Sequence, residues 1–97
     1  MIVSPHRTND GRIFLSICDN KLIGKKFEED EKILDLTSEF YLGAPRKLED
    51  TKRLLEKAFM SNFIGEESVS FGIKEGAIDK ENVTYISKIP VAQMIRL

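Results

Sequence analysis

The stretch TNDGRIFLSICDNKLIGKKF (Thr8–Phe27) decides how this chain begins to fold. Its first four residues, Thr8 to Gly11, are a strong turn signal, because Asn, Asp and Gly tolerate positive φ angles. The residues that follow alternate between the two faces of a strand: Ile13, Leu15 and Ile17 against Phe14, Ser16 and Cys18. With Ile2-Val3 before the turn, this pattern predicts an antiparallel hairpin.

The middle of the chain changes from strand signals to helix signals. Gly24 marks a bend, Phe27–Glu31 reads as an acidic turn, and Lys32–Leu36 as a third strand. Leu48–Phe59 is the clearest helix, because its apolar residues share one arc at helical spacing. A second helix is predicted after it, with Asn62 as its N-cap and Gly76 at its carboxyl end.

The end of the chain returns to strands. Val83–Ser87 predicts a fourth strand, Pro90 a break, and 91–97 a last strand. The resulting order is β-β-β-α-α-β-β. Strands grouped at both ends of the chain predict an α+β fold, with a mainly antiparallel sheet and two helices packed on one face. Its 97 residues form one domain, 1–97.

Composition excludes several classes of function. The net charge is −1, so any contact with nucleic acid must come from a local patch. One cysteine allows neither an internal disulfide nor a zinc site of several thiolates, and one histidine leaves little for any metal. No apolar run reaches the roughly 18 residues of a membrane span, and no signal peptide is evident. We expect a cytoplasmic protein without cofactor, metal or membrane contact.

The Gly24-Lys25-Lys26 run suggests a phosphate-binding loop, but the spacing excludes a P-loop. The first glycine of that motif would fall on Asp19, and the required hydroxyl on Lys26. Two interpretations stay open: a solvated bend, or phosphate contact by Lys21, Lys25 and Lys26 as point charges. The outer face of the first helix adds Arg46, Arg53 and Lys57 as candidate contacts to RNA or a protein partner.

No group of residues predicts catalysis. His6 is the one histidine, and nothing in the spacing joins it to Cys18 or to a serine. Cys18 ends a strand and reads as a small core residue. Asp19 and Gln93 are weak ligand candidates, because each stands where a polar group can face a ligand.

Four motifs then resemble a known family: CDNKLIGK, FYLG, IGE and IDKENV, in that order between Phe14 and Gln93. They are similar to the small archaeal proteins of the domain of unknown function 424 family. That resemblance implies an archaeal, intracellular protein of about this length, without an assigned activity. Genes of the family accompany translation genes, which points towards RNA or the ribosome. It also implies a final Pro-His-Ala-Gln motif, in which Val91 here replaces the histidine.

Three functions compete at this point. The preferred hypothesis is a non-catalytic accessory module that binds RNA or a translation-related ribonucleoprotein. The alternatives are a protein-interaction or homodimer module that pairs through a sheet edge, and a small-molecule-binding enzyme.

Overall fold

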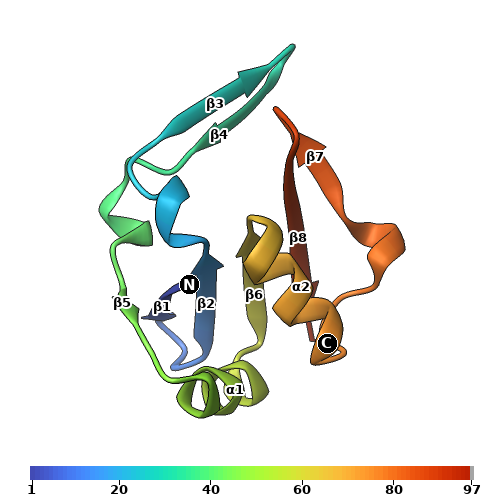
Figure 1. The fold of residues 1–97 in the computed structure, drawn as a ribbon. Coiled ribbons are helices and arrows are strands. Elements are labelled where there is room, and N and C mark those ends of the chain that lie inside the picture. The colour runs from blue at the N-terminus through green and yellow to red at the C-terminus, as the bar shows by residue number, and fades with distance from the viewer. Residues whose placement is uncertain (97) are drawn as a thin grey trace.

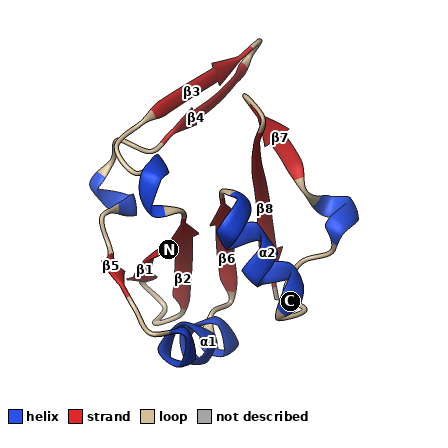
Figure 2. Cartoon of the chain, in the orientation of Figure 1, coloured by secondary structure: helices blue, strands red, loops and turns tan. Residues whose placement is uncertain are grey.

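The computed structural model describes residues 1–96, and it forms an α+β fold around one six-stranded sheet (Figure 1, Figure 2). The strands of the described region are β1 (Ile2–Arg7), β2 (Ile13–Cys18), β3 (Lys26–Glu29), β4 (Lys32–Asp35), β5 (Ala44–Pro45), β6 (Met60–Ile64), β7 (Thr84–Ile86) and β8 (Ile89–Ile95). The helices are α1 (Leu48–Lys57) and α2 (Glu66–Lys74), with 3₁₀ turns η1 (Asn20–Leu22), η2 (Glu39–Tyr41) and η3 (Lys80–Asn82).

The sheet has the strand order β5-β1-β2-β6-β8-β7. Its neighbouring strands are antiparallel except for β2 and β6, which run parallel with Cys18 opposite Ile64. A parallel pair needs a long crossover connection, and here the connection contains the β3–β4 hairpin, η2, β5 and α1. The carboxyl ends of β2 and β6 therefore meet at one edge of the sheet.

Both helices pack on one face of the sheet, as predicted. Leu55 and Ala58 of α1, and Val69 and Phe71 of α2, lie in the same apolar cluster as Phe63 of β6. A second cluster joins the end of the sheet to the β3–β4 hairpin, and its buried residues are Cys18, Leu22, Leu34, Leu36 and Ile64. The hairpin is thus held to the sheet without being one of its strands (Figure 1).

The predicted second helix is wrong in its first part. Asn62 is not an N-cap but lies inside β6, and α2 begins four residues later, at Glu66. The reason is burial: Phe63 and Ile64 fill the centre of the sheet, with at most 2% of each exposed. The observed order therefore has a strand between the two helices. Gly76, with φ 74°, ends α2 as expected.

Two other predictions need correction. Three residues of the predicted acidic turn belong to a strand, since Phe27, Glu28 and Glu29 lie in β3 and the turn itself is at Asp30–Glu31. Pro90 does not break a strand but lies within β8, opposite Tyr85. Pro90 lacks an N–H, which is tolerated because β6 has ended at Ile64, one residue short of the level of Pro90. β8 ends at Ile95, and Leu97 of the predicted last strand lies outside the described residues.

The Gly72→Ala variant should be less stable than the wild type, although Ala is the better helix former. A Cβ atom at Gly72 would lie 2.8 Å from Phe63 Cδ1 and 2.9 Å from Ile78 Cδ1 in a packed core. Overpacking of this kind costs about 1–3 kcal/mol. Urea denaturation would measure it, with Ser70→Ala on the exposed side of α2 as control. A Gly72→Ala variant as stable as wild type would show that α2 can shift on β6.

Candidate functional site

Asp19, the residue after β2, forms hydrogen bonds with the first turn of α2. Its carboxylate accepts hydrogen bonds from the Ser68 backbone N–H (2.8 Å), the Ser68 hydroxyl (2.8 Å) and the Glu67 backbone N–H (3.2 Å). The side chain is almost wholly buried, with 6% exposed. Asp19 thus satisfies amide groups that the first turn of a helix leaves unpaired, although it stands 48 residues earlier in the chain than Glu67.

The contact between Asp19 and α2 also requires a glycine at position 65, directly before α2. The φ angle of Gly65 is 103°, a conformation that side chains disfavour. A Cβ atom there would lie 2.3 Å from Asp19 Cγ. The Gly65 N–H donates to the Pro90 carbonyl (2.9 Å), which ties β8 to the same point. Two motifs of the sequence, around Asp19 and around Gly65, therefore meet in space for a structural reason.

A pocket of about 320 Å³ opens beside this contact and is lined by three lysines from separate segments. Lys21 comes from η1, Lys25 from the bend before β3, and Lys88 from the turn between β7 and β8. The wall is partly apolar and partly acidic, and its other residues are Asp19, Leu22, Phe27, Gly65, Glu66, Ser87, Ile89 and Pro90. We call it the lysine pocket.

The β7–β8 turn that carries Lys88 is held in place by β3. Its two central residues, Ser87 and Lys88, have φ angles of 50° and 68°. The Ser87 N–H donates to Glu29 Oε1 (3.1 Å), and the Ser87 hydroxyl donates to the Glu28 carbonyl (2.9 Å). Sequence reasoning missed Lys88, because a Ser-Lys pair lacks the Gly or Asn that marks such a turn.

The other predicted basic residues do not join the lysine pocket. Lys26 faces Glu28, with 3.3 Å between Nζ and Oε1. Arg46, Arg53 and Lys57 belong to α1 and the residues before it, at the opposite end of the sheet from η1 (Figure 1). Arg53 also pairs with Asp50 at 3.5 Å. Of the six predicted contact residues, Lys21 and Lys25 therefore line the lysine pocket, and the other four do not.

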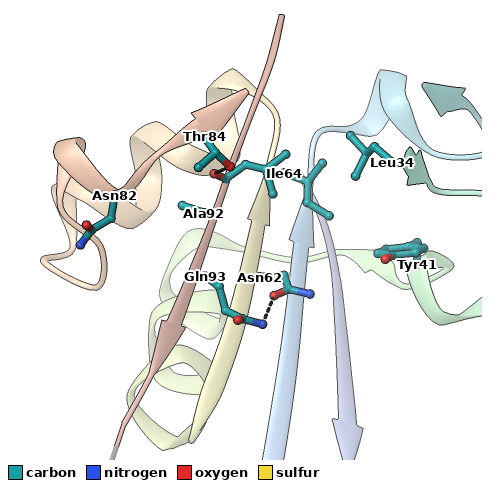
Figure 3. A pocket seen from close by; sticks show the side chains of 9 residues that line it. Leu34, Tyr41, Asn62, Ile64, Asn82, Thr84, Ala92 and Gln93 are labelled. Carbon is teal, nitrogen blue, oxygen red and sulfur yellow. Dashed lines mark hydrogen bonds between the residues drawn. The ribbon is translucent and has the colours of Figure 1, made fainter. Parts of the chain in front are cut away.

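Gln93, the second predicted ligand residue, lies in β8 and does not share a pocket with Asp19. Its amide donates to Asn62 Oδ1 (2.8 Å), and both side chains line a separate pocket on the sheet face away from the helices (Figure 3). Val91, at the position where the family resemblance implies His, lines that pocket too.

His6 and Cys18 both have structural surroundings. The His6 ring stacks on Phe40, with 4.0 Å between ring centroids, and its Nε2 lies 2.8 Å from the Phe40 carbonyl oxygen. Cys18 is buried, and burial raises the pKa of its thiol to about 12, helped by the charge of Asp19. A thiol that stays protonated is a poor nucleophile. Within residues 1–96, no three His, Cys, Asp or Glu side chains gather as metal ligands do.

Comparison with known proteins places the chain in a family. Residues 6–97 match the family described as "Protein of unknown function (DUF424)". The chain belongs to this family. None of the curated proteins searched is significantly similar to it.

The fold is shared with a solved structure. The crystal structure of an uncharacterized conserved protein from Methanopyrus kandleri superimposes with a TM-score of 0.79 at 19% sequence identity. The match covers 99% of this chain and 93% of that one. At this identity the likeness shows a common fold. No helix within residues 1–96 is long and apolar enough to cross a membrane.

The Asp19→Ala variant should be destabilised by about 2 kcal/mol or more. It removes the cap of α2 and leaves buried amides without a partner. Asp19→Asn should lose less, because an amide oxygen can still accept one of these bonds. Gly65→Ala should be at least as harmful as Asp19→Ala, since it strains the backbone and collides with the carboxylate. Thermal and urea denaturation would check the order, and equal stability of all three variants would contradict the assigned role.

Ionisation of Cys18 should make the folded state less stable at high pH. The unfolded thiol ionises near its ordinary pKa of 9.0, whereas the folded one holds its proton to about 12. Stability is therefore fully present below pH 9 and is lost as pH rises between these values. Urea denaturation from pH 8 to 10.5 should show a steeper loss for wild type than for Cys18→Ala. Parallel pH profiles would contradict the prediction.

Proposed function

We propose that this protein is a non-catalytic RNA-binding module whose lysine pocket contacts backbone phosphates. The observation that supports it most is the convergence of Lys21, Lys25 and Lys88 on one pocket. Within residues 1–96, none of the three forms an ion pair, in contrast to Lys26 and Lys52. Three ammonium groups without protein partners are available for anionic oxygens.

The carboxylates in the pocket do not cancel these lysines. Asp19 and Glu66 also line it, but the Asp19 oxygens are turned to the amides and hydroxyl of α2. Glu66 is exposed, as the three lysines are, so solvent screens all four charges alike. Among the lining residues of the pocket, the three lysines outnumber the two carboxylates, although the whole chain is slightly acidic.

The apolar wall of the pocket favours RNA over a free anion. Phe27 and Ile89 line the pocket beside the lysines and are partly exposed. A bare phosphate would gain nothing from such a wall, whereas the sugar and base next to a phosphate can pack on it. Single-stranded nucleic acid is commonly bound in this way, by positive charge along the backbone and by aromatic or apolar surface under the bases.

The alternative functions have weaker support. The edge strands of the six-stranded sheet, β5 and β7, are two and three residues long, and the strands of the separate β3–β4 hairpin have four residues each. Such short edges offer few backbone groups for pairing. An enzyme would have to work without the Cys18 thiol, whose pKa is raised to about 12.

Removal of two pocket lysines should weaken RNA binding and its salt dependence. For Lys25→Gln with Lys88→Gln we expect at least a tenfold loss at low salt. The slope of log K against log salt should fall by about 1.4, because each phosphate contact with a single strand contributes about 0.7. Fluorescence anisotropy with a labelled single-stranded RNA would measure both quantities.

The control carries the same change of charge at the other end of the sheet. Arg53→Gln with Lys57→Gln removes two positive charges from α1 and should leave affinity and slope close to wild type. If both double variants weaken binding equally, the contact is diffuse and the pocket is not its site. Wild-type protein that binds no RNA at low salt would refute the proposed function.

A further inference from the structure

A row of four polar side chains crosses the sheet on the face away from the helices. In the register of β1, β2, β6 and β8, Ser4 lies opposite Ser16, Ser16 opposite Asn62, and Asn62 opposite Gln93. Their neighbours along each strand, such as Leu15, Phe63 and Met94, belong to the apolar cluster that packs against the helices. Since side chains alternate along strands, the row faces the other side.

The row is bordered by apolar rows. On one side it meets Cys18, Ile64 and Val91, which lie opposite one another in the register. On the other side it meets Phe14, Met60 and Ile95. Close packing against Gly43 accounts for a small side chain at Ser4, whereas Asn62 and Gln93 are long side chains in the other half of the row. Its polar atoms need another explanation.

One half of the row is closed and the other half is open. Ser4 and Ser16 are 3% and 1% exposed, and their hydroxyl oxygens have no hydrogen-bond partner within residues 1–96. Gly43 covers Ser4 so closely that a Cβ atom there would lie 2.3 Å from its Oγ. Asn62 and Gln93, by contrast, reach a pocket of about 430 Å³.

This second pocket, which we call the carboxamide pocket, has no formally charged side chain among its lining residues within 1–96. These residues are Leu34, Tyr41, Asn62, Ile64, Asn82, Thr84, Val91, Ala92 and Gln93. Burial raises the pKa of Tyr41, so its hydroxyl is neutral at physiological pH. Such a lining disfavours ions. It suits a neutral ligand that both donates and accepts hydrogen bonds and has an apolar face.

The pair of carboxamides at the centre of the pocket presents a fixed pattern. Gln93 Nε2 donates to Asn62 Oδ1 at 2.8 Å, which leaves the Asn62 amide as donor and the Gln93 oxygen as acceptor. Figure 3 shows this pair between Asn82 on one side and Tyr41 on the other. An adjacent donor and acceptor are what the edge of a nucleobase requires, and Asn or Gln commonly supplies them.

We propose that the carboxamide pocket binds one unpaired nucleobase, with Asn62 and Gln93 reading its edge. This inference rests on the proposed function, since the base would belong to the RNA whose phosphates the lysine pocket holds. Unpaired bases are the parts of RNA that proteins read in sequence-specific recognition, by their edges and by stacking on aromatic rings. The β7–β8 hairpin contributes to both pockets, through Lys88 and through Thr84, Val91 and Gln93.

Free nucleosides test this pocket without phosphate contacts. Adenosine, guanosine, cytidine and uridine are titrated into ¹⁵N-labelled protein at millimolar concentration. We expect one nucleoside to shift the side-chain amide resonances of Asn62 and Gln93 at lower concentration than the other three. The Asn62→Ala with Gln93→Ala variant should bind at least tenfold more weakly, whereas Asn20→Ala, an exposed residue of η1, should bind as wild type does.

Several results would overturn the inference. They are the absence of any shift at these amides, an equal shift with ribose alone, and wild-type binding by the double variant. A melting curve for each variant separates loss of the site from loss of the fold.

RNA titration separates the two proposals. Asn62→Ala with Gln93→Ala should change the preference among oligo-A, oligo-C and oligo-U and keep the salt slope. Unaltered preference would count against the base pocket alone. Nucleoside binding by a protein that binds no RNA would support the pocket and refute the proposed function.

Discussion

The contact between the Asp19 carboxylate and the first turn of α2 is the constraint on which this end of the molecule depends. A buried carboxylate is costly unless hydrogen bonds compensate it, and α2 provides three such bonds. The helix in turn gains a negative group at its positive end. Gly65 is fixed by the same contact, because any side chain there would collide with Asp19. The ends of β2 and β6, adjacent and parallel, are thereby held together.

Both pockets follow from the way the chain leaves this point. After Asp19 the chain turns through η1 and Gly24, and this turn places Lys21 and Lys25 in the lysine pocket. The β3–β4 hairpin that follows packs on the second apolar cluster, which contains Cys18 and Ile64. The β7–β8 hairpin reaches the same region because Gly65 binds Pro90 and Ser87 binds β3. Lys88, in the turn of this hairpin, therefore lines the same pocket as Lys21 and Lys25. Strand β8 of the hairpin also carries Gln93, on the sheet face opposite the helices.

Local signals in the sequence predicted local structure well. The turn at Thr8–Gly11, the helix from Leu48 and the stop at Gly76 are all present, because each depends on neighbouring residues. β6 was missed, since Met60–Ile64 is too short to show its period and its burial depends on strands far away in sequence. For the same reason, the grouping of residues in the two pockets could be predicted only in part. Lys21 and Lys25 stand in one run, but nothing local joins them to Lys88, nor Asn62 to Gln93.

The side chain at position 91 limits which chemistry members of the family can have in common. The resemblance implies His at this position, and here the side chain lines the carboxamide pocket between Ile64 and Thr84 of the neighbouring strands. A histidine there would bring a titratable ring next to the Asn62–Gln93 pair, whereas valine keeps the pocket neutral in this chain. Proton transfer at that position is thus not possible here. Either this position is structural in the family, or this chain lacks a function that the histidine supplies elsewhere.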